Sequence, residues 1–520
     1  MYSDKLIYGR DTTENIVSLE VIDEKVILFK ENGGVITTEE REYYPWLITV
    51  DNLAPSRAVK LAGEQPYKWF TSFANIEKWK DAKTLLYRKQ TDFYCVNNLK
   101  EQYMIRNGIT YFKGMKPKDI SVVSFDIETS GLTLDSTSMV FCITNVFRNS
   151  NGIVEKHFFL DEYDNVEDMI NSWCKWIREI NPTIILGHNI ISYDLKYLDF
   201  MSKSGLRLGR DGSKLTFNSR VRQFRKDGSQ SYDYNEPHIY GREVVDTFFL
   251  SIQYDIGRSF PSYGLKSIIK HLGLEKDGRV FVDTSKIKYY YDNEPEMWER
   301  VKEYAIADVE DSLKLFDLMI PSKIFFTQHI SKSFQEMCLS ATGSQINNFL
   351  VRGYLQDDHS VAKAEEITES IQGGISFAVP GVYKNLYKVD LKSCYPSQVL
   401  RFKLYDKTKD PDALFYRMVH HFANKRFEYK IKFKETNDHY WKEMDAVSKI
   451  FINSAYGVCT TNGLNYNCRW IGAKITEESR NIINLALSWA SGYDSVHWFK
   501  IFREKTGKET DELEENDESP

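Results

Sequence analysis

The chain has 520 residues and a formal net charge of −6, and 42% of its residues are hydrophobic and 14% aromatic. This composition excludes a disordered chain, and the length predicts about three or four domains. The net charge excludes a protein that is basic throughout, although DNA binding requires only a local basic surface. Two segments are basic enough for such a surface: residues 401–434 and residues 207–226, the second of which fits a solvated face equally well.

The cysteines and the apolar runs restrict the compartment. The seven cysteines form no Cys-x-x-Cys pair, so we expect neither a disulfide framework nor a zinc site, and this suits a reducing cytosol. The N-terminal residues lack the apolar segment of a signal peptide. No run approaches the roughly 18 apolar residues of a membrane span, so no membrane contact is expected.

Residues 1–118 are rich in strand patterns. Short strands are predicted at residues 5–8 and 24–29, and the Asn-Gly-Gly sequence at 32–34 predicts a turn. No group of catalytic residues stands out, which favours a structural or binding domain.

From residue 119 onward, strands and helices alternate, which predicts an α/β domain. Strands are expected at 121–125, 140–146, 154–160 and 183–186, and a helix with one apolar side at 166–180. Residues 207–235, rich in Gly, Ser and Arg, interrupt this order as a long excursion.

The C-terminal third is expected to be mainly helical. A strand is predicted at 386–391, two long helices at 412–434 and 439–456 with a polar break between them, and an apolar helix at 475–489. From residue 503 the chain is acidic and poor in apolar residues, so a disordered tail is expected.

Three short motifs carry carboxylates that could bind hard cations. Asp126 and Glu128 follow a buried strand, and strand alternation places both on one face. Asp194 follows another buried strand, and Tyr304 and Asp308 are four residues apart on a helix. His188 and His271 are expected to be hydrogen-bonded structural residues rather than general bases.

Two further motifs lie in the helical third. Residues 390–397 read Asp-Leu-Lys-Ser-Cys-Tyr-Pro-Ser, and residues 449–457 read Lys-Ile-Phe-Ile-Asn-Ser-Ala-Tyr-Gly. Two pairs of polar residues are spaced by four, so each pair shares a helix face. The pairs are Arg426 with Lys430 and Lys449 with Asn453.

The three carboxylate motifs resemble the exonuclease motifs of the DEDDy class of 3′–5′ exonucleases. This resemblance implies that Asp126, Glu128, Asp194 and Asp308 bind two Mg²⁺ ions, for which Mn²⁺ can substitute. It implies that Tyr304 orients the attacking water.

The other two motifs resemble two of the three core motifs of family B DNA polymerases, and the enzymes of tailed, myovirus-like bacteriophages are most similar. The resemblance implies that Asp390 binds both metals, that Tyr395 lies under the incoming sugar and that Tyr456 packs at the nascent base pair. It implies four contacts to the triphosphate of a dNTP: Arg426, Lys430, Lys449 and Asn453.

The sequence departs from the family pattern at three places. Cys394 replaces the usual leucine, and Ile371 stands where the family has the tyrosine of Tyr-x-Gly-Gly. No Tyr-x-Asp-Thr-Asp sequence, the third core motif, follows residue 457, and Asp494 is only a faint echo of it.

The implied fold is an α/β and α+β multidomain protein that combines an RNase H-like exonuclease domain with a partial palm and helical fingers. The predicted domains begin with an N-terminal β-rich domain (1–118), the exonuclease domain (119–320) and a return to the N-terminal domain (321–362). They continue with the first part of the palm (363–412), the fingers (413–462), an incomplete palm (463–502) and the acidic tail (503–520).

Three functions remain open. The favoured one is the N-terminal subunit of a split DNA polymerase with proofreading exonuclease, working in phage DNA replication in the cytoplasm of an infected bacterium. Its expected partners are primer-template and single-stranded DNA, dNTPs, a C-terminal subunit with the third motif and thumb, and a sliding clamp bound through that subunit. The alternatives are a stand-alone exonuclease with a remnant polymerase region, and a nucleic-acid-binding regulator without catalysis.

Overall fold

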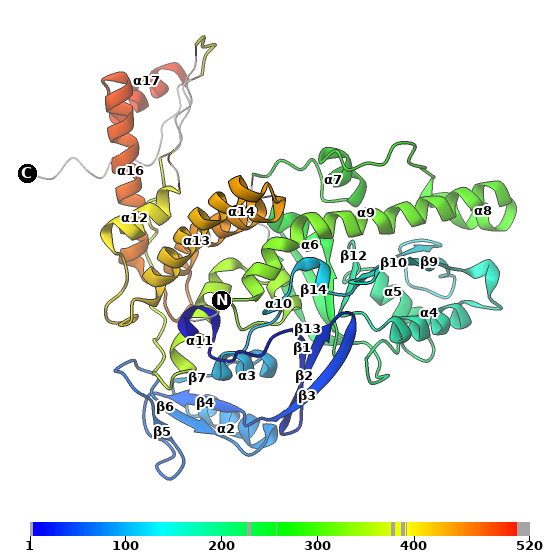
Figure 1. Ribbon diagram of the computed structural model, residues 1–520, viewed down its shortest axis with the longest axis horizontal. Coiled ribbons are helices and arrows are strands. Elements are labelled where there is room, and N and C mark those ends of the chain that lie inside the picture. Colours follow the sequence, from blue (N-terminus) through cyan, green and yellow to red (C-terminus); the bar gives the residue numbers. More distant parts are fainter. Residues whose placement is uncertain are drawn as a thin grey trace, which may run out of the picture. The chain divides into compact units, whose positions relative to one another are not determined.

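The computed structural model describes residues 4–225, 230–255, 257–375, 380–385, 391 and 393–506. The chain divides into two compact units (Figure 1). The first contains the residues up to 48, 53–59 and 70–340, and the second contains 49–52, 60–69 and the residues from 341 onward. The predicted α/β and α+β multidomain class is confirmed. The finer domain boundaries stay predictions, and helix α9 (Pro295–Thr327) runs through the one placed at 320/321.

The chain begins with a helical turn where the sequence predicts a strand. Residues 5–8 form α1 (Lys5–Tyr8), and the Asp4 carboxylate caps it by accepting a hydrogen bond from the Leu6 N–H at 3.0 Å. The strand prediction is wrong here because a run of four largely apolar residues does not distinguish a helical turn from a strand.

A three-stranded antiparallel sheet follows in the order β1 (Ile16–Ile22), β2 (Lys25–Asn32), β3 (Val35–Glu42). Strand β2 confirms the strand predicted at 24–29. Gly33 and Gly34 have φ of 58° and 80°, a conformation that glycine adopts without strain, so they form the predicted turn between β2 and β3.

Short strands and two helices complete the region before residue 118. Four strands pair in the order β5-β6-β4-β7. The elements are β4 (Trp46–Thr49), β5 (Val59–Lys60), β6 (Trp69–Ser72), α2 (Ile76–Arg88), β7 (Phe93–Tyr94) and α3 (Leu99–Asn107).

A six-stranded mixed sheet forms the centre of the first unit. Its main path is β10-β9-β8-β12-β15, and β11 also pairs with β9. Strand β9 runs antiparallel to β8, whereas β12 is parallel to both β8 and β15. The strands are β8 (Val122–Thr129), β9 (Val140–Asn149), β10 (Gly152–Glu155), β11 (Phe158–Phe159), β12 (Ile184–Gly187) and β15 (Glu243–Asp246).

Alternation along β8 sends its side chains into two different cores. Phe125 packs in one core with Trp173 of α4 (Val166–Ile180), the helix predicted at 166–180. On the other face, Val122 packs in the core that contains Phe316 of α9, and the Ser124 hydroxyl donates to the Val309 carbonyl at 3.1 Å. The even-numbered residues of β8 therefore face α9.

The remaining helices of the first unit flank this sheet or follow it (Figure 1). They are α5 (Asp194–Met201), α6 (Thr247–Tyr254), α7 (Leu265–His271), α8 (Ile287–Asn293) and α10 (Phe334–Leu339).

The predicted excursion at 207–235 contains a regular antiparallel ribbon. Strands β13 (Thr216–Arg225) and β14 (Ser231–His238) pair with each other, with an irregularity in register between Phe217 and Val221. Arg222 forms ion pairs with Glu236, at 3.0 Å, and with Glu336 of α10. Arg222 belongs to the basic segment 207–226. Because its guanidinium pairs with two carboxylates, this arginine is a structural residue.

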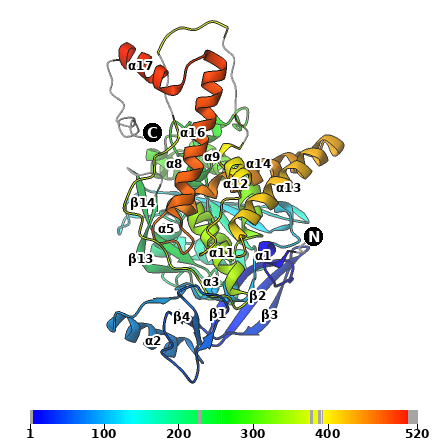
Figure 2. The same ribbon diagram turned by 90° about the vertical axis from the view of Figure 1, so that its left-hand side faces the viewer.

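The described part of the second unit is mainly helical. Helices α13 (Leu414–Thr436) and α14 (His439–Ser454) confirm the two predicted long helices and lie side by side as an antiparallel pair (Figure 1 and Figure 2). Asn437 ends α13 with φ of 51°, and the Asp438 carboxylate caps α14 through the Tyr440 N–H at 3.0 Å. The other helices are α11 (Thr342–Leu355), α12 (Cys394–Phe402), α15 (Tyr456–Thr460), α16 (Arg469–Ser491) and α17 (Ser495–Thr506).

Two predictions in this unit need correction, and a third falls on residues that the structure does not describe. Helix α16 begins at Arg469, six residues before the predicted start, and ends at Gly492 with φ of 77°. Helix α17 continues to Thr506, so residues 503–506 of the predicted disordered tail are helical. Residues 386–390, which include the predicted strand and Asp390, lie outside the described residues.

Candidate functional site

Three carboxylates meet at the end of strand β8. Asp126 and Glu128 come from β8 and Asp308 from α9, and one oxygen atom of each lies within 4.8 Å of the others. The two β8 residues point toward α9 because they share the face of Ser124, which contacts that helix. The structure thus brings together three of the four predicted carboxylates.

Asp194, the fourth carboxylate, is buried at the first position of α5. After burial, its charge helps to raise the pKa of Asp126 and of Glu128, so it lies within electrostatic range of these two carboxyls. The loop before α5 is fixed by Asp246 at the end of β15. The Asp246 carboxylate accepts hydrogen bonds from the backbone N–H groups of Asn189 and Ile191 at 2.7 and 3.0 Å. Asp246 is a positioning residue that the sequence reasoning did not assign.

Tyr304 lies one helical turn before Asp308 and is buried. The Lys266 ammonium lies 4.0 Å from the centre of the Tyr304 ring and 3.5 Å from Asp308 Oδ2. Arg279, which is almost fully buried, forms ion pairs with Asp308 and Asp311. Neither Lys266 nor Arg279 belongs to a motif from which the sequence predicts a role at this site.

The contacts of His188 indicate a structural rather than a catalytic role. Its Nδ1 lies 2.9 Å from Thr247 Oγ1 and its Nε2 lies 2.9 Å from the Tyr263 carbonyl oxygen, so both ring nitrogens have partners. Burial lowers the pKa of His188 to about 4, so the ring is neutral at physiological pH. This agrees with the structural role predicted for it.

Even with Lys266 and Arg279 beside Asp308, the four carboxylates are not all charged at neutral pH unless a divalent cation binds. Burial, followed by neighbouring carboxylates, raises the pKa of Glu128 to about 8. Burial raises the pKa of Asp194 to about 7, and the pKa values of Asp126 and Asp308 are also raised. A set of carboxylate oxygens at this spacing fits divalent cations such as Mg²⁺, which prefer oxygen ligands and favour the ionised form.

These raised pKa values predict how stability depends on pH. Without divalent cations, the folded chain holds protons on these carboxyls to higher pH than the unfolded chain does. The free energy of unfolding should therefore fall as pH rises from about 4 to about 8. In EDTA, we expect the Tm to be lower at about pH 8 than at about pH 5.5, and millimolar Mg²⁺ to raise it more at the higher pH.

The matched variant for this measurement is Asp126→Asn with Glu128→Gln, which keeps the shape and removes both titrating groups. The difference in Tm between the two pH values should shrink in this variant, because two of the titrating groups are gone. It should not vanish, because the other buried carboxyls are unchanged. An equal fall in Tm for both proteins would contradict the assignment of the effect to this cluster.

In the second unit, the structure brings two predicted nucleotide-site tyrosines together. The rings of Tyr395 on α12 and Tyr456 on α15 have centroids 5.0 Å apart and are tilted by 53°. The position of Asp390 relative to them lies outside the described residues.

The predicted triphosphate contacts lie on the α13 and α14 pair. Arg426 and Lys430 of α13 both approach Asp445 of α14, with N–O distances of 2.9 and 3.9 Å. Lys449 and Asn453 are exposed and follow Asp445 by one and two turns of α14. Asp445 is a further residue that the sequence reasoning did not single out.

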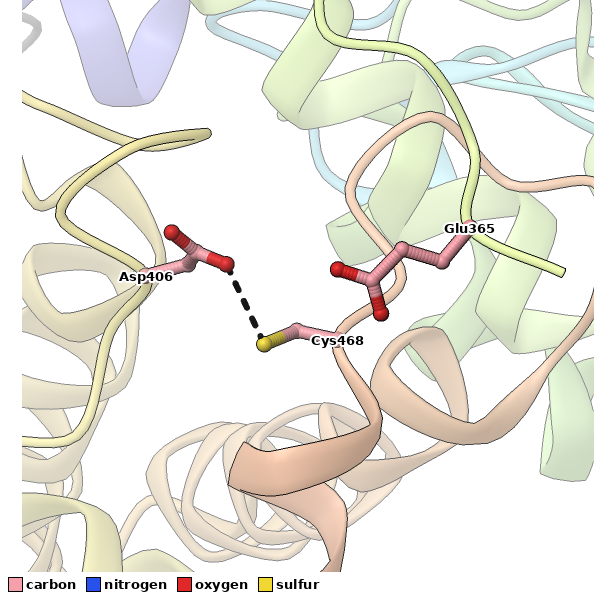
Figure 3. Close-up of side chains that lie close together, drawn as sticks. All are labelled: Glu365, Asp406 and Cys468. Atoms are coloured by element: carbon pink, nitrogen blue, oxygen red, sulfur yellow. Dashed lines mark hydrogen bonds between the residues drawn. The ribbon is translucent and has the colours of Figure 1, made fainter. Parts of the chain in front are cut away.

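A second group of possible ligand atoms, Glu365, Asp406 and Cys468, lies in the same unit (Figure 3). The Cys468 thiol donates to Asp406 Oδ2 at 3.3 Å, and burial raises the pKa of that thiol to about 12. The Lys409 ammonium lies 3.2 Å from Glu365 Oε1 and donates to the Asn467 carbonyl at 2.6 Å. Since a lysine already supplies positive charge to this group and the thiol is protonated, we assign no metal to it.

Comparison with protein families supports the exonuclease-like part of the first unit. Residues 109–268 match the family model described as "DNA polymerase family B, exonuclease domain". This match includes Asp126, Glu128 and Asp194 and ends before Tyr304 and Asp308.

Several similar proteins are DNA polymerases of archaea. A DNA polymerase of Desulfurococcus sp. (strain Tok) is 22% identical over 427 residues, which cover 74% of this chain and 53% of the relative. DNA polymerase 1 of Pyrococcus abyssi is 23% identical over 432 residues, with the same coverage. The chain thus spans about half the length of these curated relatives.

A solved structure shows the fold. The family B DNA polymerase from Pyrobaculum calidifontis superposes with a TM-score of 0.72 at 17% identity, covering 91% of this chain and 71% of that one. The chain is therefore similar to family B DNA polymerases in fold and includes a segment that matches their exonuclease domain. The predicted bacteriophage affiliation and host cytoplasm stay predictions, since the relatives named here are archaeal. Within the described residues, no helix has both the length and the apolarity to cross a membrane.

Proposed function

We propose that the chain removes nucleotides from the 3′ ends of DNA and also carries the nucleotide-binding part of a family B DNA polymerase. The observation that supports the first activity best is the convergence of Asp126, Glu128 and Asp308, from a strand and a helix distant in sequence. Asp194 and Tyr304 lie beside them, and the segment carrying three of the four carboxylates matches an exonuclease domain.

In the proposed reaction, water attacks the terminal phosphodiester and the 3′ oxygen of the shortened strand leaves. Asp126, Glu128, Asp194 and Asp308 would hold two divalent cations, which supply activation of water and stabilisation of the leaving oxygen when bound. Tyr304 orients the attacking water through its hydroxyl. Lys266, beside both Tyr304 and Asp308, adds positive charge where the phosphodiester gains negative charge.

The direct test uses single-stranded DNA labelled at its 5′ end. With Mg²⁺ or Mn²⁺, the purified chain should yield a ladder of labelled products shortened from the 3′ end, and EDTA should stop the reaction. DNA blocked by a 3′-terminal phosphorothioate linkage should be shortened more slowly. Release of labelled mononucleotide from the 5′ end, or no shortening at all, would contradict the proposal.

For the polymerase part, we propose that Arg426, Lys430, Lys449 and Asn453 bind the triphosphate of a dNTP. Tyr395 and Tyr456 contact its sugar and base, and Asp390 binds metal there. The paired rings of Tyr395 and Tyr456, and the cations gathered on α13, support this arrangement.

DNA synthesis would further require a polypeptide that supplies a second palm aspartate and a thumb, and we propose that this is a separate subunit. The exposed apolar end of α16 supports a docking surface: Leu485 and Trp489 have exposed fractions of 70% and 86%. A sliding clamp would bind through that subunit. The second candidate is a stand-alone exonuclease. In that function the cations that are proposed to bind the triphosphate would have no role.

A further inference from the structure

Asp445 lies in the middle of the cations that are proposed to bind the triphosphate. Its Oδ1 accepts a hydrogen bond from Arg426 Nε at 2.9 Å, and its Oδ2 lies 3.9 Å from Lys430 Nζ. One carboxylate on α14 thus faces two of the cations of α13, Arg426 and Lys430.

The position of Asp445 along α14 places it on the proposed binding face. Residues 445, 449 and 453 are spaced by four, so Asp445, Lys449 and Asn453 form one stripe on the helix. Arg426 also donates from Nη1 to Ser393 Oγ at 2.6 Å, and Ser393 directly precedes α12, which carries Tyr395. Arg426 therefore connects the residues around Tyr395 with α14 through Asp445.

The helix pair does not depend on this ion pair for its packing. The rings of Phe422 and Phe451 are 4.7 Å apart and buried between the helices, together with Met418 and Val447. Near the other end of the pair, Tyr429 stacks on Trp441 at 5.6 Å. Because apolar contacts hold α13 against α14, the charge of Asp445 is free to serve another purpose.

We propose that Asp445 is a built-in counter-ion of the nucleotide site, which occupies Arg426 and Lys430 until a triphosphate displaces it. This inference rests on the proposed function of these cations. A triphosphate and Asp445 are both anionic, so they compete for the same guanidinium and ammonium groups. The Asp445 and Arg426 side chains are 22% and 14% exposed, so solvent screens the pair less than it would at a fully exposed site. Asp445 thereby sets how tightly the site binds anions.

The test measures binding of Mg–dATP to the full chain by isothermal titration calorimetry, with inorganic triphosphate as a second probe. Asp445→Asn keeps the shape and removes the charge, so it should lower the Kd for both probes by about tenfold. Asp445→Ser is the second variant, in case the amide forms new hydrogen bonds. Glu443→Gln is the matched control, because it removes the same charge from an exposed position two residues away on α14 and should leave the Kd unchanged.

A double-mutant comparison separates this inference from the function on which it rests. In the Arg426→Ala, Lys430→Ala background, Asp445→Asn should no longer tighten binding, because the cations that it competes for are gone. If that background binds Mg–dATP as tightly as the unmodified chain, the proposed nucleotide site is wrong. If the background weakens binding but both Asp445 variants leave the Kd unchanged or raise it, only the counter-ion role is wrong.

Discussion

Replacing Asp126 and Glu128 together with alanine should reduce the degradation of single-stranded DNA from its 3′ end by roughly three orders of magnitude or more. Both carboxylates face Asp308 at the end of β8, so their loss removes two of the oxygen ligands that converge there. The remaining Asp194 and Asp308 would hold divalent cations weakly and in altered positions. The measurement is the initial rate of shortening of a 5′-labelled oligonucleotide with saturating Mg²⁺.

The control for this variant is Glu162→Ala with Asp164→Ala. These two acids are also two residues apart in the first unit, but both are exposed and neither is among the carboxylates that converge with Asp308. The control should keep the rate of the unmodified chain. Because removing mutually repelling carboxylates relieves strain in the metal-free state, Asp126→Ala with Glu128→Ala should also fold normally. Full activity in a folded double variant would place the active site elsewhere.

Charging the exposed end of α16 should abolish DNA synthesis while leaving the exonuclease intact. Leu485 and Trp489 are four residues apart, so they share one exposed face of the helix. If a further polypeptide docks there with an obligate-size interface of roughly 2,000 Å² or more, then Leu485→Asp with Trp489→Asp buries two unpaired charges. We expect template-directed primer extension, measured with that polypeptide added, to fall at least about 100-fold.

The matched comparison is Leu485→Asp alone against Asn481→Asp alone. Both add one negative charge to the same exposed face of α16, one turn apart, but only Leu485→Asp replaces an apolar side chain. Asn481→Asp should keep primer extension and co-purification with the added polypeptide, and both variants should keep exonuclease activity. Primer extension by the carefully purified chain alone, or retained pairing in the Leu485→Asp, Trp489→Asp variant, would refute the docking surface.

Features that depend on residues close together in the chain could be predicted from the sequence. Strand alternation placed Asp126 and Glu128 on one face, and helical spacing placed Tyr304 and Asp308 on one side of α9. The long helices α13 and α14 followed from their helical pattern and from the polar residues 435–438 between them. In each case the signal has a period of two or about four residues, which a single sequence displays directly.

The distant residues that complete each site could be identified only from the packing of the folded chain. Lys266, Arg279 and Asp246 surround the carboxylate cluster from separate elements, and Asp445 meets Arg426 across two helices. The same holds for the exposure of Leu485 and Trp489, since an apolar helix looks alike whether or not another element covers it. These contacts join residues far apart in the chain, and no local periodicity records them, because their partners are set by how the strands and helices pack.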